Sequence, residues 1–226
     1  MISGWGELAL AFAVFVAAHS GPTRPGVRRR LTALFGERGY LLLYSALSLV
    51  LLAWLIVAAG RAPFLPIWDP APWQAGAAAG LMAPACLLLA FSLGAPNPFS
   101  IDGGDPARFD PERPGIVGVT RHPLLWAVAL WAGAHLLANG DLAHVLLFGG
   151  FLVMALLGVL LLERRARRRL GEPAWHALAV RRRPGWPGMD LWLRLAAAVG
   201  LYLGLLHLHR PVIGVDPLAW LRVPGI

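Results

Sequence analysis

Residues 142–162 read LAHVLLFGGFLVMALLGVLLL, a run of 21 residues without one Asp, Glu, Lys or Arg. A helix needs about 20 apolar residues to cross the hydrocarbon core of a bilayer. The next seven residues, 163–169, include five arginines. Arginines beside an apolar span are typical of its cytoplasmic end. We therefore predict a membrane-spanning helix that reaches the cytoplasmic side near residue 163.

The composition extends this prediction to the whole chain. Of 226 residues, 58% are hydrophobic and 14% are charged, whereas a soluble domain has about 45–50% and about 25%. This composition excludes a soluble Rossmann or barrel enzyme, and the single cysteine, Cys86, cannot form an internal disulfide. We predict an all-α, polytopic membrane bundle of about six transmembrane helices, with one integral-membrane domain over residues 1–226.

Two of the connections between spans are predicted to have structure of their own. Residues 94–121 hold too many Gly, Pro and Asn for a long helix, so we expect a structured cytoplasmic cap. Residues 163–183 extend the fifth span as a basic, interfacial segment. The first span lacks a basic start and a cleavage site, so we expect a membrane span there and not a removable signal peptide. The expected spans are residues 2–19, 40–59, 73–93, 122–138, 142–162 and 191–209.

The arginines predict the topology. All 20 basic residues are Arg, against 12 acids, and the net charge is +8. Sixteen lie in the first, third and fifth connections, and three lie in the other connections and the C-terminal tail. The odd connections should then face the cytoplasm and both termini the periplasm, in a bacterial inner (plasma) membrane. Short arginine runs beside spans suit membrane lipids, not nucleic acid. A hydrophobic small molecule is the expected ligand, and no protein partner is indicated.

Histidines are the candidate functional residues, because an ionisable side chain in a span is costly and marks a functional site by default. Three of the seven histidines lie beside small residues or at the predicted start of a helix: His19, His122 and His135. Two intramembrane histidines on different helices would suit a haem b pocket. The others are expected at interfaces or at the outer ends of spans: His144, His176, His207 and His209.

The start of the fourth span has its own signals. Pro123 suits the first helical position, and Thr120 is predicted to be the N-cap. Arg121 beside this helix start is suited to an anionic group.

Four motifs resemble the NnrU family of bacterial membrane proteins, over about residues 1–185. The family is named for an association with denitrification and nitrogen-oxide metabolism. On this resemblance, the span 191–209 is an additional C-terminal helix. The motifs are HSG at 19–21, LFGERGY at 34–40, NPFS at 97–100, and the run from TRHPLLW at 120–126 through LW at 130–131 to AHLLANGD at 134–141.

NnrU proteins are in turn similar to 15-cis-ζ-carotene isomerase, a membrane enzyme that holds haem b and isomerises a carotenoid double bond. The resemblance implies haem b, with His19 and His135 as axial iron ligands and with Arg121 and His122 at the cytoplasmic mouth. It implies isoprenoid isomerisation or denitrification-linked nitrogen-oxide metabolism. Ala132 stands where the isomerase has a cysteine, so a redox ligand switch of that type is not expected here.

Helix geometry leaves two alternatives for the second iron ligand. His122 and His135 are separated by thirteen residues, about 20 Å along a helix axis. His19, at the inner end of the first span, should lie level with His122. Either the first span sits higher in the membrane, with its helix continuing past Gly21, or His122 is the partner of His19.

A fainter resemblance concerns isoprenylcysteine and phospholipid methyltransferases. It rests on Arg121-His122-Pro123, Glu163, LGEPAWH at 170–176 and Arg183-Pro184. It implies S-adenosylmethionine bound by Arg121, His122 and Glu163, although Leu125 replaces the aromatic residue usual after the proline. A third alternative is a non-enzymatic haem carrier or accessory factor for a denitrification complex. None of the three assigns a catalytic residue.

Overall fold

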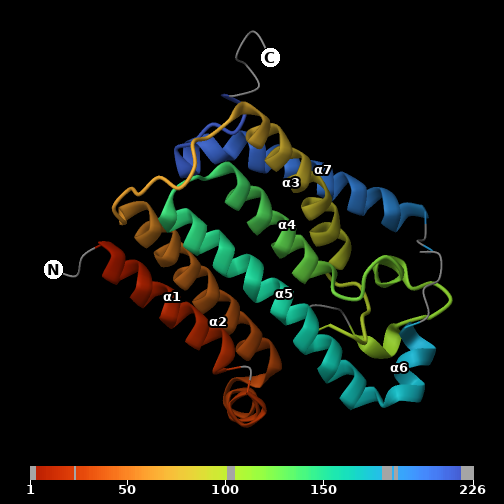
Figure 1. Ribbon diagram of the computed structural model, residues 1–226. Coiled ribbons are helices and arrows are strands. Elements are labelled where there is room, and N and C mark those ends of the chain that lie inside the picture. Colours follow the sequence, from red (N-terminus) through yellow and green to blue (C-terminus); the bar gives the residue numbers. More distant parts are fainter. Residues whose placement is uncertain (1–3, 23, 101–104, 180–184, 186–187, 220–226) are drawn as a thin grey trace. The chain divides into compact units, whose positions relative to one another are not determined.

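The computed structural model describes residues 4–22, 24–100, 105–179, 185 and 188–219 (Figure 1). Apart from one isolated bridge between Pro66 and Asp141, the regular structure of these residues is helical, which confirms the all-α class. In chain order, the elements are α1 Gly4–Ser20, α2 Pro25–Arg61, α3 Pro72–Ser92, the 3-10 helices η1 Pro106–Arg108 and η2 Gly115–Gly118, α4 Pro123–Ala138, α5 Leu142–Leu170, α6 Glu172–Ala179 and α7 Gly188–Ile213.

Each of the six expected spans coincides with a helix. Four helices, α2, α3, α5 and α7, are long and apolar enough to cross a membrane. The other two, α1 and α4, are apolar but have only 17 and 16 residues. Large apolar side chains such as Leu42 and Leu49 are 73% and 66% exposed, as lipid-facing residues would be. The chain has the helices of a membrane protein, while its sidedness and its membrane stay predictions.

Helix α2 is interrupted at Gly36. Its φ of 70° and ψ of 167° lie outside the helical region, and glycine adopts a positive φ without a Cβ penalty. The interruption separates the arginine-rich residues 25–35 from the apolar residues 37–61. The first connection is therefore largely helical, where the sequence predicted only a link between spans.

The chain forms two compact units, which are described separately. The first comprises residues 1–68 and 140–147, and in it α1 packs against α2. Glu7 joins the two helices, because its Oε1 accepts hydrogen bonds from Trp54 Nε1 at 3.4 Å and Arg61 Nη1 at 3.3 Å. Near the start of α5, the Gly140 carbonyl accepts hydrogen bonds from the amides of Ile67 and Trp68 at 2.6 and 3.1 Å.

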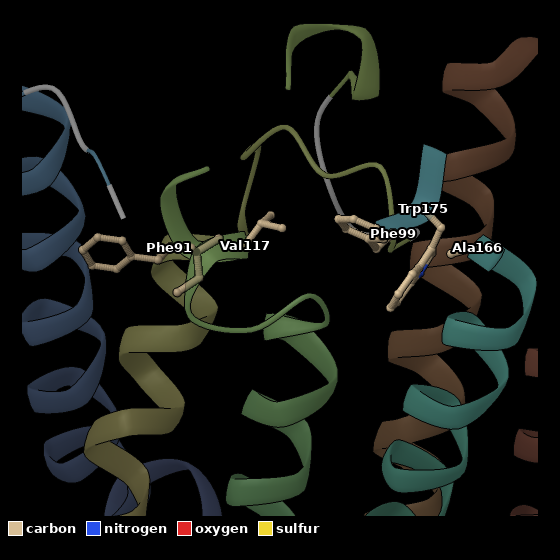
Figure 2. Packing of buried hydrophobic residues seen from close by; sticks show 6 residues of the cluster. Phe91, Phe99, Val117, Ala166 and Trp175 are labelled. Atoms are coloured by element: carbon tan, nitrogen blue, oxygen red, sulfur yellow. The ribbon is translucent and has the colours of Figure 1, made fainter. Parts of the chain in front are cut away.

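The second unit comprises residues 69–139 and 148–226, and in it α3 packs against both α4 and α7. Helix α5 approaches α4 closely at Gly158, where a Cβ would lie 3.2 Å from Leu125 Cδ1. That both units belong to one integral-membrane domain stays a prediction. A buried apolar cluster lies beneath the cap and joins α3, α5 and α6 (Figure 2): Phe91, Phe99, Ile116, Val117, Ala166 and Trp175.

The described part of residues 94–121 forms turns and the two short 3-10 helices η1 and η2, and no long helix. The predicted structured segment is thus confirmed, although its side of the membrane is not tested. Phe99, Ile116 and Val117 enter the buried cluster, so this cap is packed and not merely a connection. From α7, Arg194 Nη1 donates to the carbonyls of Ala90, Phe91 and Leu93 at the end of α3.

We predict that Gly140→Ala lowers the apparent Tm of the purified protein. The added Cβ would lie 1.9 Å from the Trp68 carbonyl oxygen, so the loop must shift. The cost is about 1–3 kcal/mol, which corresponds to roughly 2–10 °C at this chain length. Gly149→Ala is the matched control, since its Cβ would meet nothing within 4 Å. Equal Tm values for the two variants, measured by thermal unfolding in detergent, would contradict the prediction.

Candidate functional site

His122 lies at the start of α4 and is only 3% exposed. Pro123 occupies the first helical position, as predicted, but the N-cap is His122 itself and not Thr120. The α region is disfavoured for a residue before proline, and His122, with φ −126° and ψ 61°, lies outside it, so the helix begins at Pro123. Thr120 Oγ1 instead accepts a hydrogen bond from the His122 amide at 3.4 Å. With this local geometry, the His122 ring is buried within the second unit.

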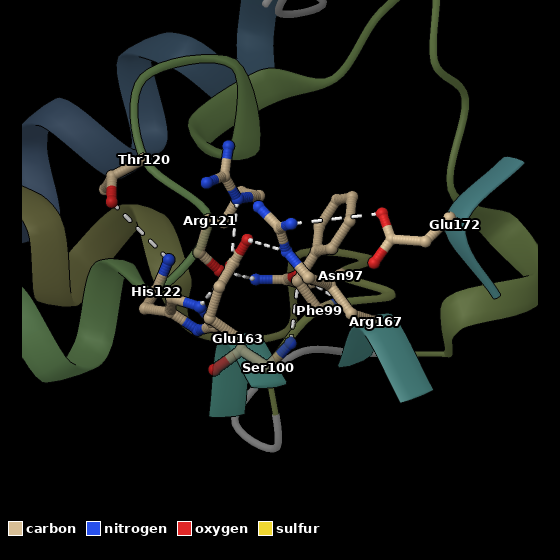
Figure 3. Close-up of polar contacts among 9 residues, drawn as sticks. All are labelled: Asn97, Phe99, Ser100, Thr120, Arg121, His122, Glu163, Arg167 and Glu172. Atoms are coloured by element: carbon tan, nitrogen blue, oxygen red, sulfur yellow. Dashed lines mark hydrogen bonds and ion pairs between the residues drawn. The ribbon is translucent and has the colours of Figure 1, made fainter. Parts of the chain in front are cut away.

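Glu163 of α5 meets both residues of the Arg121-His122 pair (Figure 3). Its Oε2 atom lies 3.1 Å from Arg121 Nε and 3.1 Å from His122 Nε2. Its other oxygen, Oε1, has no hydrogen-bond partner among the described residues, although Arg167 Nε lies 3.7 Å away. The Glu163 side chain is 19% exposed. The Glu163 carboxylate thus lies close to two arginines and a histidine, directly after the uncharged run 142–162.

Trp175 of α6 orients the two arginines. The guanidinium of Arg167 lies 3.9 Å from the centre of its ring, and that of Arg121 lies 5.2 Å away. Arg121 also lies 6.0 Å from the ring of Phe99. A cation over an aromatic face is attracted by the ring quadrupole. Trp175 lies in the segment 163–183, which the sequence predicted to be interfacial, whereas its side chain is 6% exposed and supports the site.

Asn97 fastens the cap to the site and is 2% exposed. Its Oδ1 accepts hydrogen bonds from the amides of Phe99 and Ser100 at 2.9 and 3.3 Å, and its Nδ2 donates to the Arg121 carbonyl at 3.0 Å. An Asn side chain that bonds the backbone two residues ahead makes a turn. Asn97 and Pro98 belong to the NPFS motif at 97–100, which by itself did not predict this role.

A cleft of about 250 Å³ adjoins these residues in the second unit. It has a polar end and an apolar wall, so it can hold a small molecule with both characters. The lining residues are Val117, Val119, Thr120, Arg121, His122, Trp126, Val159, Leu160, Glu163 and Ala179. The three residues that the methyltransferase resemblance grouped, Arg121, His122 and Glu163, therefore lie together.

His19 belongs to the first unit and is partly buried. Its Nδ1 atom lies 2.9 Å from the Phe15 carbonyl oxygen, its ring stacks on Phe15 at 4.0 Å, and Tyr44 is edge-on at 5.8 Å. A carbonyl only accepts, so Nδ1 carries the proton and the lone pair of the neutral ring is on Nε2. Helix α1 ends at Ser20, so the expected continuation of this helix past Gly21 is wrong, while the histidine that pairs with His19 stays a prediction.

His135 belongs to the second unit and has a similar environment. Its Nδ1 atom lies 2.8 Å from the Trp131 carbonyl oxygen, and Trp131 and Phe148 contact its ring. The ring of His209, which the sequence placed at the outer end of α7, is 6.2 Å away. His135 and His122 stand at opposite ends of the continuous helix α4, as the sequence geometry required.

Among the described residues, no three His, Cys, Asp or Glu side chains cluster as a metal site. A family model described as NnrU protein matches residues 7–217. The chain belongs to the NnrU family. The match extends beyond residue 185 and includes α7. Neither a curated protein nor a solved structure matches the chain. Membership of the NnrU family therefore rests on the sequence of nearly the whole chain.

We predict that Glu163→Gln destabilises this NnrU protein by about 1–3 kcal/mol, because Arg121, His122 and Arg167 lose the carboxylate that they share. Glu172→Gln is the matched control: Glu172 is 60% exposed, and an exposed ion pair contributes about 1 kcal/mol or less. The measurement is thermal unfolding in detergent at one pH. A larger Tm loss for Glu172→Gln than for Glu163→Gln would sink the prediction.

Proposed function

We propose that this NnrU protein binds haem b in the membrane, with His19 and His135 as axial ligands, and acts on a lipid-soluble isoprenoid or in nitrogen-oxide metabolism. The observation that carries the proposal is shared by the two histidines. Each is partly buried against aromatic rings, and each has Nδ1 bonded to a backbone carbonyl. Metal-ligating histidines are typically oriented by such a bond through the ring nitrogen that does not bind the metal.

The donor set fits haem. Its iron needs only one or two protein ligands, so a cluster of three side chains is not required. When bound, haem would supply a redox-active iron whose potential an apolar shell tunes. In the first unit, Phe15 and Tyr44 would orient His19 and shield it from water, and in the second unit Phe148 would do the same for His135.

We predict that the protein, expressed with haem supplied and purified in mild detergent, shows a Soret band and sharp reduced α and β bands. His19→Ala and His135→Ala should abolish these bands. His207→Ala is the matched control, since His207 also bonds a backbone carbonyl through Nδ1 but is exposed. Bands that survive His135→Ala and vanish in His122→Ala would identify His122 as the ligand instead. A spectrum without haem would refute the proposal.

A turnover assay separates an isomerase from a non-enzymatic haem carrier or accessory factor. An isomerase would turn over a supplied cis-polyene in the reduced, haem-loaded state, and the product would be followed by chromatography. A haem carrier or accessory factor for a denitrification complex would bind haem without such turnover.

A second candidate is an S-adenosylmethionine-dependent methyltransferase. The observation that favours it is the meeting of Arg121, His122 and Glu163 at one cleft. These side chains offer donors to a carboxylate and an acceptor to a cationic or hydroxyl group.

For this candidate we predict that the purified protein retains radiolabelled S-adenosylmethionine on gel filtration. Arg121→Gln and Glu163→Gln should each reduce retention about tenfold, the effect of losing a charge-assisted hydrogen bond. Glu172→Gln should retain the label, since its side chain does not line the cleft. Absence of retention in the unsubstituted protein would eliminate the methyltransferase.

A further inference from the structure

The cleft of the second unit is chemically two-sided. Its polar end consists of Thr120, Arg121, His122 and Glu163. The rest of the lining is apolar and comes mainly from η2 and its flank, α4 and α5. Its volume of about 250 Å³ equals roughly eight waters at ~30 Å³ each, enough for a head group and the start of a chain. A ligand that fills it must therefore be amphipathic.

The apolar wall is accessible from the lipid side of the unit. Val119, Trp126 and Leu160 line the cleft and are 51%, 40% and 55% exposed. Leu160 belongs to the uncharged run of α5, a helix long enough to span a membrane. Exposed apolar side chains on such a helix face lipid tails. A bilayer molecule can thus reach the cleft sideways, without passing through water.

The polar end favours a negative head group. Arg121 bonds Glu163 through Nε, and its terminal nitrogens have no hydrogen-bond partner among the described residues, while the side chain is 30% exposed. The two arginines at this end, Arg121 and Arg167, share the carboxylate of Glu163. At the end of α5, four further exposed arginines have no acidic partner in the described part of the chain: Arg164, Arg165, Arg168 and Arg169.

We propose that this cleft binds a membrane-borne amphiphile whose head is an oxyanion, a carboxylate or a phosphate. The head lies against the terminal nitrogens of Arg121, which form the planar, charged donor fork that binds oxyanions best. The first carbons of the chain lie along Trp126, Val159 and Leu160, and the remainder stays in the bilayer. The proposal goes beyond haem binding and does not depend on it. It differs from the methyl-donor candidate in the ligand and in its route of entry.

The test uses the full-length protein in nanodiscs of zwitterionic lipid. Radiolabelled oleate and oleoyl-lysophosphatidate are compared with monoolein, which has the same chain and a neutral head. Both anions should bind about tenfold or more tightly than monoolein, the effect expected of one charge-assisted contact. Arg121→Gln should remove that difference, and Arg168→Gln, in the last turn of α5 and outside the cleft, should keep it. Equal binding of monoolein would overturn the proposal, as would equal losses in the two variants.

Two further arms identify the ligand's chemistry. Inorganic phosphate should not displace lysophosphatidate at equal concentration, and displacement would show that the chain plays no part. S-adenosylmethionine should not displace either anion, and displacement would assign the cleft to the methyl donor.

A steric pair keeps the proposal falsifiable should Arg121→Gln fail to fold. Leu160→Trp should fill the cleft and abolish binding while every charge is kept. Leu161→Trp is its control, because Leu161 is 50% exposed but does not line the cleft. Unchanged binding in Leu160→Trp would overturn the proposal.

Discussion

The carboxylate of Glu163 directs the arrangement of the second unit. It is the first charge after 21 uncharged residues of α5, and it is largely removed from water. An unpaired charge in such a place costs several kcal/mol, so cations must be brought to it. Arg121 and His122 come from the start of α4, and Arg167 comes from one turn along α5. Trp175 and Asn97 then position these partners, and through them the cap is fixed.

The helices were predictable from the sequence because their signals are local. Uncharged runs near 20 residues long and the position of Pro123 gave the helices and the start of α4. The site was only partly predictable. The meeting of His122 with Glu163 joins residues 41 apart, and no periodicity reports such a contact. It was anticipated only through the methyltransferase resemblance. Asn97 and Trp175 were missed because a turn residue and an interfacial tryptophan have more ordinary interpretations.

Helix α4 carries two different environments at its two ends. His122 and Arg121, at its start, belong to a charged cleft, whereas His135, near its end, lies among aromatic rings. Haem is proposed to bind at the aromatic end, at His135, and an amphiphile is proposed to bind at the charged end, at Arg121. Substitutions at one end are therefore informative controls for the other, because the separation along the helix is about 20 Å.

The shortness of α4 has a consequence for the surrounding lipid. Its 16 residues span about 24 Å, less than the hydrocarbon thickness of about 30 Å. Hydrophobic mismatch of this sign is relieved when the bilayer thins around the short helix. Thinning around α4 would lower the head-group layer toward the midplane beside Trp126, which lies one turn from His122. A lipid head group that binds at Arg121, as proposed, would then move a shorter distance, and thick, sterol-rich membranes would lengthen it.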